Sequence, residues 1–110
     1  MGIDYQVHRA SVDMSKAFRQ FQKADNAFVD DKEDSAVNHL SRGLDLFQTA
    51  LDHLAKAEED AYNKAGDLIG KGNNDLQKSI DEYAAGNDDS AAKHYADALD
   101  YYDQALDIID

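Results

Sequence analysis

The chain has 110 residues, a net charge of −12 and neither cysteine nor proline. Without cysteine it can form no disulfide, thiolate metal site or cysteine nucleophile, and its excess of acid disfavours binding to nucleic acid or anionic membranes, which depends on clustered lysine and arginine. No run approaches the roughly 18 apolar residues of a membrane span, and no secretory leader opens the sequence, so we expect one cytoplasmic domain over residues 1–110.

A long amphipathic helix is predicted over residues 3–28, because apolar residues alternate three and four positions apart. They are Ile3, Val7, Ala10, Met14, Ala17, Phe21, Ala24 and Phe28. The stretch VDDKEDS then interrupts the pattern, and Asp34 or Ser35 is the predicted N-cap of the next helix. The acids at 30–34 and at 88–89 indicate helix starts rather than calcium loops, since carboxylates favour the positive end of the helix dipole.

The second predicted helix carries two parallel stripes. One is apolar and comprises Val37, Leu40, Leu44, Phe47, Leu51 and Leu54; the other is small and comprises Ala36, Gly43, Ala50 and Ala57. Small residues at one heptad position let a neighbouring helix approach closely, so we interpret both stripes as packing surfaces. Two positions are possible for the end of this helix. Strict duplication places the connection to the next helix near residues 55–60, whereas the glycines indicate a loop over residues 70–73. Gly70 and Gly72 would each cost a helix roughly 1 kcal/mol, which favours a second helix to about residue 69 and a third from the loop to about residue 85.

The last predicted helix, residues 89–109, repeats the second one. Between residues 34–54 and 89–109, at a constant offset of 55, nine of 21 positions are identical, and the small stripe recurs as Ala91, Ala98 and Ala105. Weaker matches upstream, such as Phe28 with Tyr83, extend the internal repeat to residues 1–55 and 56–110. Each repeat predicts a helical hairpin that buries the apolar face of the other, so the predicted fold is an all-α antiparallel four-helix bundle built from two duplicated hairpins.

One segment of the second repeat resembles a known family. Gly86, Ala91, Tyr95, Ala98 and Leu99 are similar to the turn and second helix of a tetratricopeptide repeat, in which glycine ends one helix and small and aromatic residues dock the next. The resemblance covers about 14 residues, 86–99. It implies a repeat-like helical hairpin and the binding of a protein partner.

The four histidines are His8, His39, His53 and His94. His39 and His94 are equivalent in the repeat, and they would converge on one site only if their helices adjoined. The sequence contains neither an HExxH motif nor another pair of histidines four residues apart. Duplication of one histidine at the boundary of the core is therefore a simpler explanation for His39 and His94 than a metal or haem site. We therefore expect no cofactor.

His53 carries the alternative hypothesis. The sequence HLAKA, with Lys56 three residues after His53 and Ala57 four residues after it, resembles the phospho-acceptor stretch of histidine phosphotransfer domains, which are acidic four-helix bundles. The resemblance implies an imidazole that accepts a phosphoryl group, a lysine that screens its charge and a small residue that admits the partner. Glu58, Glu59 and Asp60 follow directly and would repel phosphate.

The sequence contains no nucleophile and base at diagnostic spacing, GxGxxG motif, P-loop or EF-hand loop, so we expect a non-enzyme. The leading prediction is an interaction module that binds a protein partner or self-associates through its helical faces; the alternative is phosphotransfer through His53. Aspartate outnumbers glutamate nineteen to four, which predicts a crowded negative surface whose repulsion salt would screen.

Overall fold

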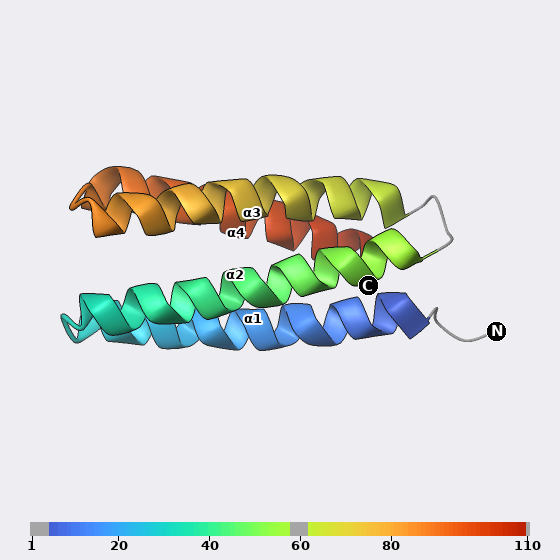
Figure 1. Cartoon of the computed structure of the whole chain (residues 1–110), viewed down its shortest axis with the longest axis horizontal. Coiled ribbons are helices and arrows are strands. Elements are labelled where there is room, and N and C mark those ends of the chain that lie inside the picture. The colour runs from blue at the N-terminus through green and yellow to red at the C-terminus, as the bar shows by residue number, and fades with distance from the viewer. Residues whose placement is uncertain (1–4, 58–61, 110) are drawn as a thin grey trace.

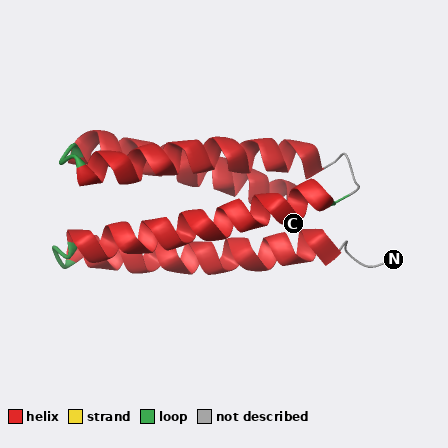
Figure 2. Cartoon of the chain, in the orientation of Figure 1, coloured by secondary structure: helices red, strands yellow, loops and turns green. Residues whose placement is uncertain are grey.

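The computed structural model describes residues 5–57 and 62–109. It contains four α-helices: α1 (Tyr5–Val29), α2 (Glu33–Lys56), α3 (Asn63–Ala84) and α4 (Asp88–Ile109). Helix α1 packs along α2 and α3 packs along α4, which gives two hairpins in a bundle of 48 × 19 × 18 Å (Figure 1). No strand occurs in the described part of the chain (Figure 2), so the predicted all-α four-helix fold is confirmed. None of these helices is long and apolar enough to cross a membrane.

The predicted stripes form the core. In α1 the predicted residues from Val7 to Ala24 are buried, Phe28 is half-buried, and Ile3 lies outside the described residues. In α2 the small residues Ala36, Gly43 and Ala50 are buried, whereas Val37 and Leu51 of the large stripe are half-buried. In α4, Ala91, Ala98 and Ala105 have no exposed surface, whereas Leu99 and Leu106 are half-buried. The small residues therefore lie at the centre of the contact and let the helices approach, while the leucines cover its edges.

Two turns with the same geometry connect the helices within each hairpin. In the first, the Lys32 N–H donates to the Ala27 carbonyl; in the second, the Asn87 N–H donates to the Glu82 carbonyl, both at 2.8 Å. Each turn needs one residue with positive φ, which is Asp31 at 60° in the first and Gly86 at 84° in the second. Asp31 thus takes the place of the turn glycine, because aspartate is one of the few residues that tolerate the left-handed region.

This turn also moves the start of the second helix. Helix α2 begins at Glu33, and its N-cap is Lys32, without a side-chain hydrogen bond. The predicted caps, Asp34 and Ser35, therefore lie inside the helix. The prediction that the acids mark helix starts is confirmed, since Glu33 and Asp34 occupy the first turn of α2 and Asp88 and Asp89 that of α4.

The predicted loop over residues 70–73 is wrong. Helix α3 runs through these residues without a break, and α2 ends at Lys56, so the connection lies where strict duplication places it; residues 58–61 of that connection are outside the described part. The reason is packing across the hairpin. A Cβ on Gly72 would lie 2.5 Å from Cε1 of Tyr102, so glycine is what lets this ring lie against α3. The contact offsets the intrinsic cost of glycine in a helix.

Aromatic rings fill the centre of the core. The rings of Phe47 and Tyr102, which are equivalent in the repeat, are parallel with centroids 3.5 Å apart. Phe28 and Tyr83 are also equivalent, and their centroids are 4.8 Å apart. We infer an approximate twofold relation between the hairpins from these two pairs of equivalent rings; it is not exact, because α2 packs against α3 whereas α1 barely contacts α4. The repeat thus places residues i and i+55 at the same height on opposite sides of the bundle.

Candidate functional site

The equivalent histidines do not form a shared site. The Nδ1 atom of His39 lies 2.8 Å from Oε1 of Gln20, and Nδ1 of His94 lies 3.4 Å from Oδ1 of Asp75. Gln20 and Asp75 are themselves equivalent, so each histidine turns towards the first helix of its own hairpin. His94 has an additional partner in Glu82, whose Oε1 lies 3.1 Å from Nε2. Among the described residues, no group of three or more histidines, aspartates or glutamates could hold a metal ion.

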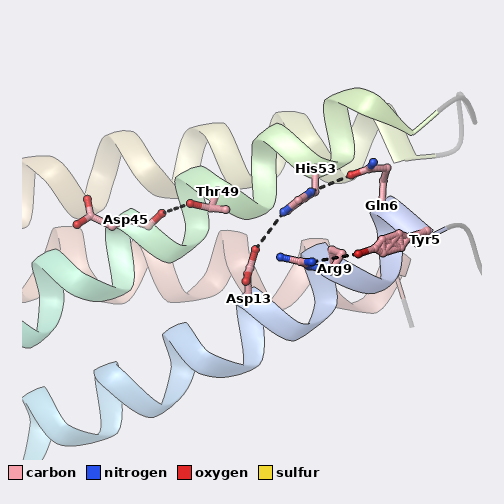
Figure 3. Close-up of polar contacts among 7 residues, drawn as sticks. All are labelled: Tyr5, Gln6, Arg9, Asp13, Asp45, Thr49 and His53. Atoms are coloured by element: carbon pink, nitrogen blue, oxygen red, sulfur yellow. Dashed lines mark hydrogen bonds and ion pairs between the residues drawn. The ribbon is translucent and has the colours of Figure 1, made fainter.

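His53 lies in a polar cluster near the end of the first hairpin that is farthest from its turn, where α1 begins and α2 ends (Figure 3). Its Nδ1 is 2.8 Å from Oε1 of Gln6, and its Nε2 is 3.7 Å from Oδ2 of Asp13. Asp13 is buried, with 10% of its side chain exposed, and this Oδ2 has no hydrogen-bond partner. In the second repeat the equivalent residues are Leu68 and Ile108, so an apolar pair there corresponds to a polar pair here.

These contacts favour a structural role for His53. Both ring nitrogens face an acceptor oxygen, and 18% of the side chain is exposed. A phosphoryl group on Nε2 would lie against the carboxylate of Asp13, where like charges repel. Lys56, the predicted charge-screening residue, is exposed in the last turn of α2. Phosphotransfer stays a prediction: acid-labile phosphate acquired from a phosphorylated response regulator, lost with His53→Ala and kept with His39→Ala, would support it.

A different site lies at the end of the bundle that carries the two hairpin turns (Figure 1). A cleft of about 500 Å³ opens there between the hairpins, in the size range of small-ligand sites. Residues of α1, α2, α3 and α4 and of the first turn line it. We call it the tip cleft, and its lining consists of Asp25, Phe28, Asp31, Glu33, Tyr83, Asp88, Asp89, Ala92 and Tyr95.

Three aromatic side chains line the tip cleft. Phe28 and Tyr83 are half-buried and tilted by 34° to each other, and together they bridge the two hairpins. Tyr95 is buried, and its hydroxyl donates to Oδ1 of Asp25 at 3.1 Å, which ties α4 to α1. Burial, together with the neighbouring carboxylate of Asp25, raises the pKa of Tyr95 well above its ordinary value. This hydroxyl therefore stays a hydrogen-bond donor at neutral pH.

No lysine or arginine in the described part of the chain forms an ion pair with the carboxylates of the tip cleft. Glu33 and Asp88 are equivalent in the repeat, so the twofold relation brings them together at the starts of α2 and α4. Asp88 is the main cause of a raised pKa at Glu33. Burial, followed by Asp88, Glu33 and Asp25, raises the pKa of Tyr83. Among the residues that the structure describes, every ion pair within 4.0 Å involves a histidine, so no lysine or arginine forms an ion pair with these acids.

Comparisons with protein-family models, with curated proteins and with solved structures gave no match for this chain.

The sequence indicated the parts of the tip cleft but not their assembly. The acids at 30–34 and 88–89 and the match of Phe28 with Tyr83 were visible as separate features. What sequence reasoning missed is that a twofold relation places all of them at one end, facing each other. The signal was present in the constant offset of 55, because equivalent residues near the axis must be neighbours. The role of Asp13 had no such signal, since it lies beside the apolar seam and pairs with a residue 40 positions away.

Proposed function

We propose that the protein is a non-enzymatic helical interaction module that binds a protein partner through the tip cleft. The observation that carries this proposal is the cleft itself: aromatic rings and carboxylates lie together where the two hairpins part. Tyrosine and other aromatic side chains contribute much of the binding energy at protein interfaces, and a patch of one charge attracts its complement and accelerates encounter.

The resemblance to tetratricopeptide repeats supports the same face. The similar segment, residues 86–99, forms the second turn and the first half of α4, and it contributes Asp88, Asp89, Ala92 and Tyr95 to the cleft. Partner binding, which the resemblance implies, would then use the part of the chain that carries the resemblance.

Site-specific photo-cross-linking tests the proposal. A benzophenone side chain replaces Val29, which is 82% exposed beside the first turn, or the exposed Asp89, and the control replaces the exposed Lys64 at the start of α3. In extracts of the source cells we expect one discrete adduct from the two tip positions and none from Lys64. The adduct's partner is then identified by mass spectrometry and bound again as a purified protein.

Two outcomes would contradict the proposal. Adducts from Lys64 alone would place the interface at the other end of the bundle. A purified partner that binds equally well to the chain with Asp88→Asn and Asp89→Asn, together with no adduct at Val29, would show that the tips are not the interface. If the adduct is a second copy of the chain, light scattering of the purified protein will show a dimer, and the module acts by self-association.

A further inference from the structure

We infer that the tip cleft binds arginine side chains of a basic peptide segment in its protein partner. This inference rests on the proposed function and specifies the chemistry of the partner. Three observations combine to support it: the aromatic lining, the geometry of the carboxylates and the absence of an internal cation, within the described residues, that pairs with them.

The aromatic lining selects a flat cation. An arginine or lysine over the face of a tyrosine or phenylalanine is attracted by the negative face of the ring. Phe28 and Tyr83 lie with ring centroids 4.8 Å apart and are half-buried, so part of this pair remains open to a ligand in the cleft. The planar guanidinium of arginine stacks on such rings and is more weakly hydrated than the ammonium of lysine, so it loses less on entering the cleft.

The carboxylates supply acceptors in fixed places. The hydroxyl of Tyr95 donates to Oδ1 of Asp25, which orients that carboxylate and leaves its second oxygen for another donor. Glu33 and Asp88, which also line the cleft, come from α2 and α4 and repel each other. A guanidinium presents five N–H donors and matches a carboxylate in a bidentate manner, so it can join acids from two helices at once.

Other cations fit the site less well. Calcium takes six to eight converging oxygen ligands, whereas the part of the chain that the structure describes contains no group of acids arranged to hold a metal. A polyamine would satisfy the charge but would gain nothing from bidentate pairing with the carboxylates. Charge alone therefore does not account for the combination of rings and acids, whereas arginine accounts for both.

Binding has a specific electrostatic signature. A guanidinium between Glu33 and Asp88 favours the ionised form of both acids, so it should lower the raised pKa of Glu33 towards its ordinary value. A cation that binds elsewhere on the acidic surface would leave this pKa nearly unchanged, because its charge is screened beyond about 10 Å at 0.1 M salt. An NMR titration of the Glu33 carboxyl carbon, with and without peptide, measures the difference.

The decisive experiment is fluorescence anisotropy of a labelled glycine–serine peptide that contains two arginines, with a lysine version of the same peptide and spermidine as competitors. The full chain and four variants are compared after circular dichroism has shown that each is folded. Tyr83→Leu removes one ring, and Tyr83→Phe keeps it. Asp88→Asn with Asp89→Asn removes two charges of the cleft. Asp103→Asn with Asp107→Asn removes two exposed charges far along α4.

We expect Tyr83→Leu to weaken peptide binding about fivefold and Tyr83→Phe to leave it within about twofold. Asp88→Asn with Asp89→Asn should weaken binding about tenfold, and the control variant, Asp103→Asn with Asp107→Asn, should weaken it less than about twofold. The inference is overturned if the two charge variants weaken binding equally, if Tyr83→Leu binds as well as Tyr83→Phe, or if the lysine peptide or spermidine binds as tightly as the arginine peptide. If cross-linking still places a partner at Val29 or Asp89, the proposed function stands without the inference; if it does not, both fall.

Discussion

Replacing Gly43 by alanine should destabilise the bundle, although alanine is the better helix former. Gly43 lies inside α2, and a Cβ there would be 2.9 Å from both Cδ1 and Cζ of Phe21 and closer still to Cε1. The ring would have to move. It is 3% exposed, however, and the rings of Phe47 and Tyr102 are nearly parallel to it with centroids 5.8 and 6.0 Å away.

The magnitude follows from two opposing effects. Alanine gains roughly 1 kcal/mol of helix propensity over glycine, whereas overfilling a well-packed core costs about 1–3 kcal/mol. Gly70 provides the matched control, because it also lies inside a helix and a Cβ there would have nothing within 4 Å. Gly70→Ala should therefore stabilise the protein by about 0.5–1 kcal/mol. The propensity gain is common to both variants, so the difference between them, about 1–3 kcal/mol, measures the contact with Phe21.

Urea and thermal unfolding followed by far-ultraviolet circular dichroism measure this difference, which corresponds to about 4 °C in Tm for each kcal/mol in a domain of this size. Gly72→Ala repeats the test in the second hairpin against the ring of Tyr102. Adding Phe21→Leu to Gly43→Ala should recover part of the loss, because the smaller side chain makes room. If Gly43→Ala stabilises the protein as much as Gly70→Ala does, the close helix approach that we describe does not exist in solution.

The remaining predictions concern the turns, the buried tyrosine and the surface charge. Asp31→Gly should raise the free energy of unfolding by about 0.5–1 kcal/mol, since glycine adopts positive φ without strain; an unchanged Tm would contradict the left-handed turn. Tyr102→Phe should cost about 1–2 kcal/mol at neutral pH, because it leaves the buried Oδ1 of Asn73 without its donor at 2.7 Å. Burial raises the pKa of Tyr102, so the folded state keeps a proton that the unfolded state releases above about pH 10. Stability should therefore fall as pH rises above that value, and because Tyr102 alone accounts for at most about 1.4 kcal/mol per pH unit of this fall, the fall should be less steep in Tyr102→Phe, where Tyr95 and Tyr83 still contribute. In NMR titrations, Asp88→Asn should lower the pKa of Glu33 towards its ordinary value, so that less stability is lost as the pH rises from the unfolded-state pKa of Glu33 to its folded-state pKa; an unchanged pKa of Glu33 would exclude Asp88 as the cause. Finally, Tm should rise between about 0.1 and 1 M sodium chloride, over which the Debye length falls from about 10 to 3 Å, and a Tm indifferent to salt would count against surface repulsion.

Periodicity was sufficient to predict the fold, because a helical seam is a local property of the sequence. The failure at residues 70–73 has the opposite origin. Glycine lowers helix propensity wherever it occurs, and from the sequence alone Gly72 looks like a breaker. Its actual role depends on a ring 30 positions away, and the ring of Tyr102 fits only because Gly72 has no side chain. A local rule correctly gives the cost of a residue but not the distant contact that offsets it.

The residues of the candidate sites could be predicted from the sequence, but their contacts in three dimensions could not. The sequence identified His53 as a residue to explain, but the partners that enclose it, Gln6 and Asp13, are 47 and 40 positions away on another helix. No spacing rule connects such residues, because the register between α1 and α2 is set by how their side chains interlock. The repeat was a better guide than any motif, since it carries information about three-dimensional proximity.

Duplication also explains why the tip cleft is electrostatically unfavourable. In a symmetric pair of hairpins, any residue near the axis faces its own copy, which suits rings such as Phe28 and Tyr83 but places an acid against an acid. Once the two hairpins belong to one chain, either copy can change alone, as the difference between the polar pair at His53 and its apolar equivalent shows. Glu33 and Asp88 are nevertheless both acidic, at a cost to stability when nothing lies between them. A bound cation removes that cost, so the same repulsion that weakens the empty cleft strengthens the binding of an arginine side chain.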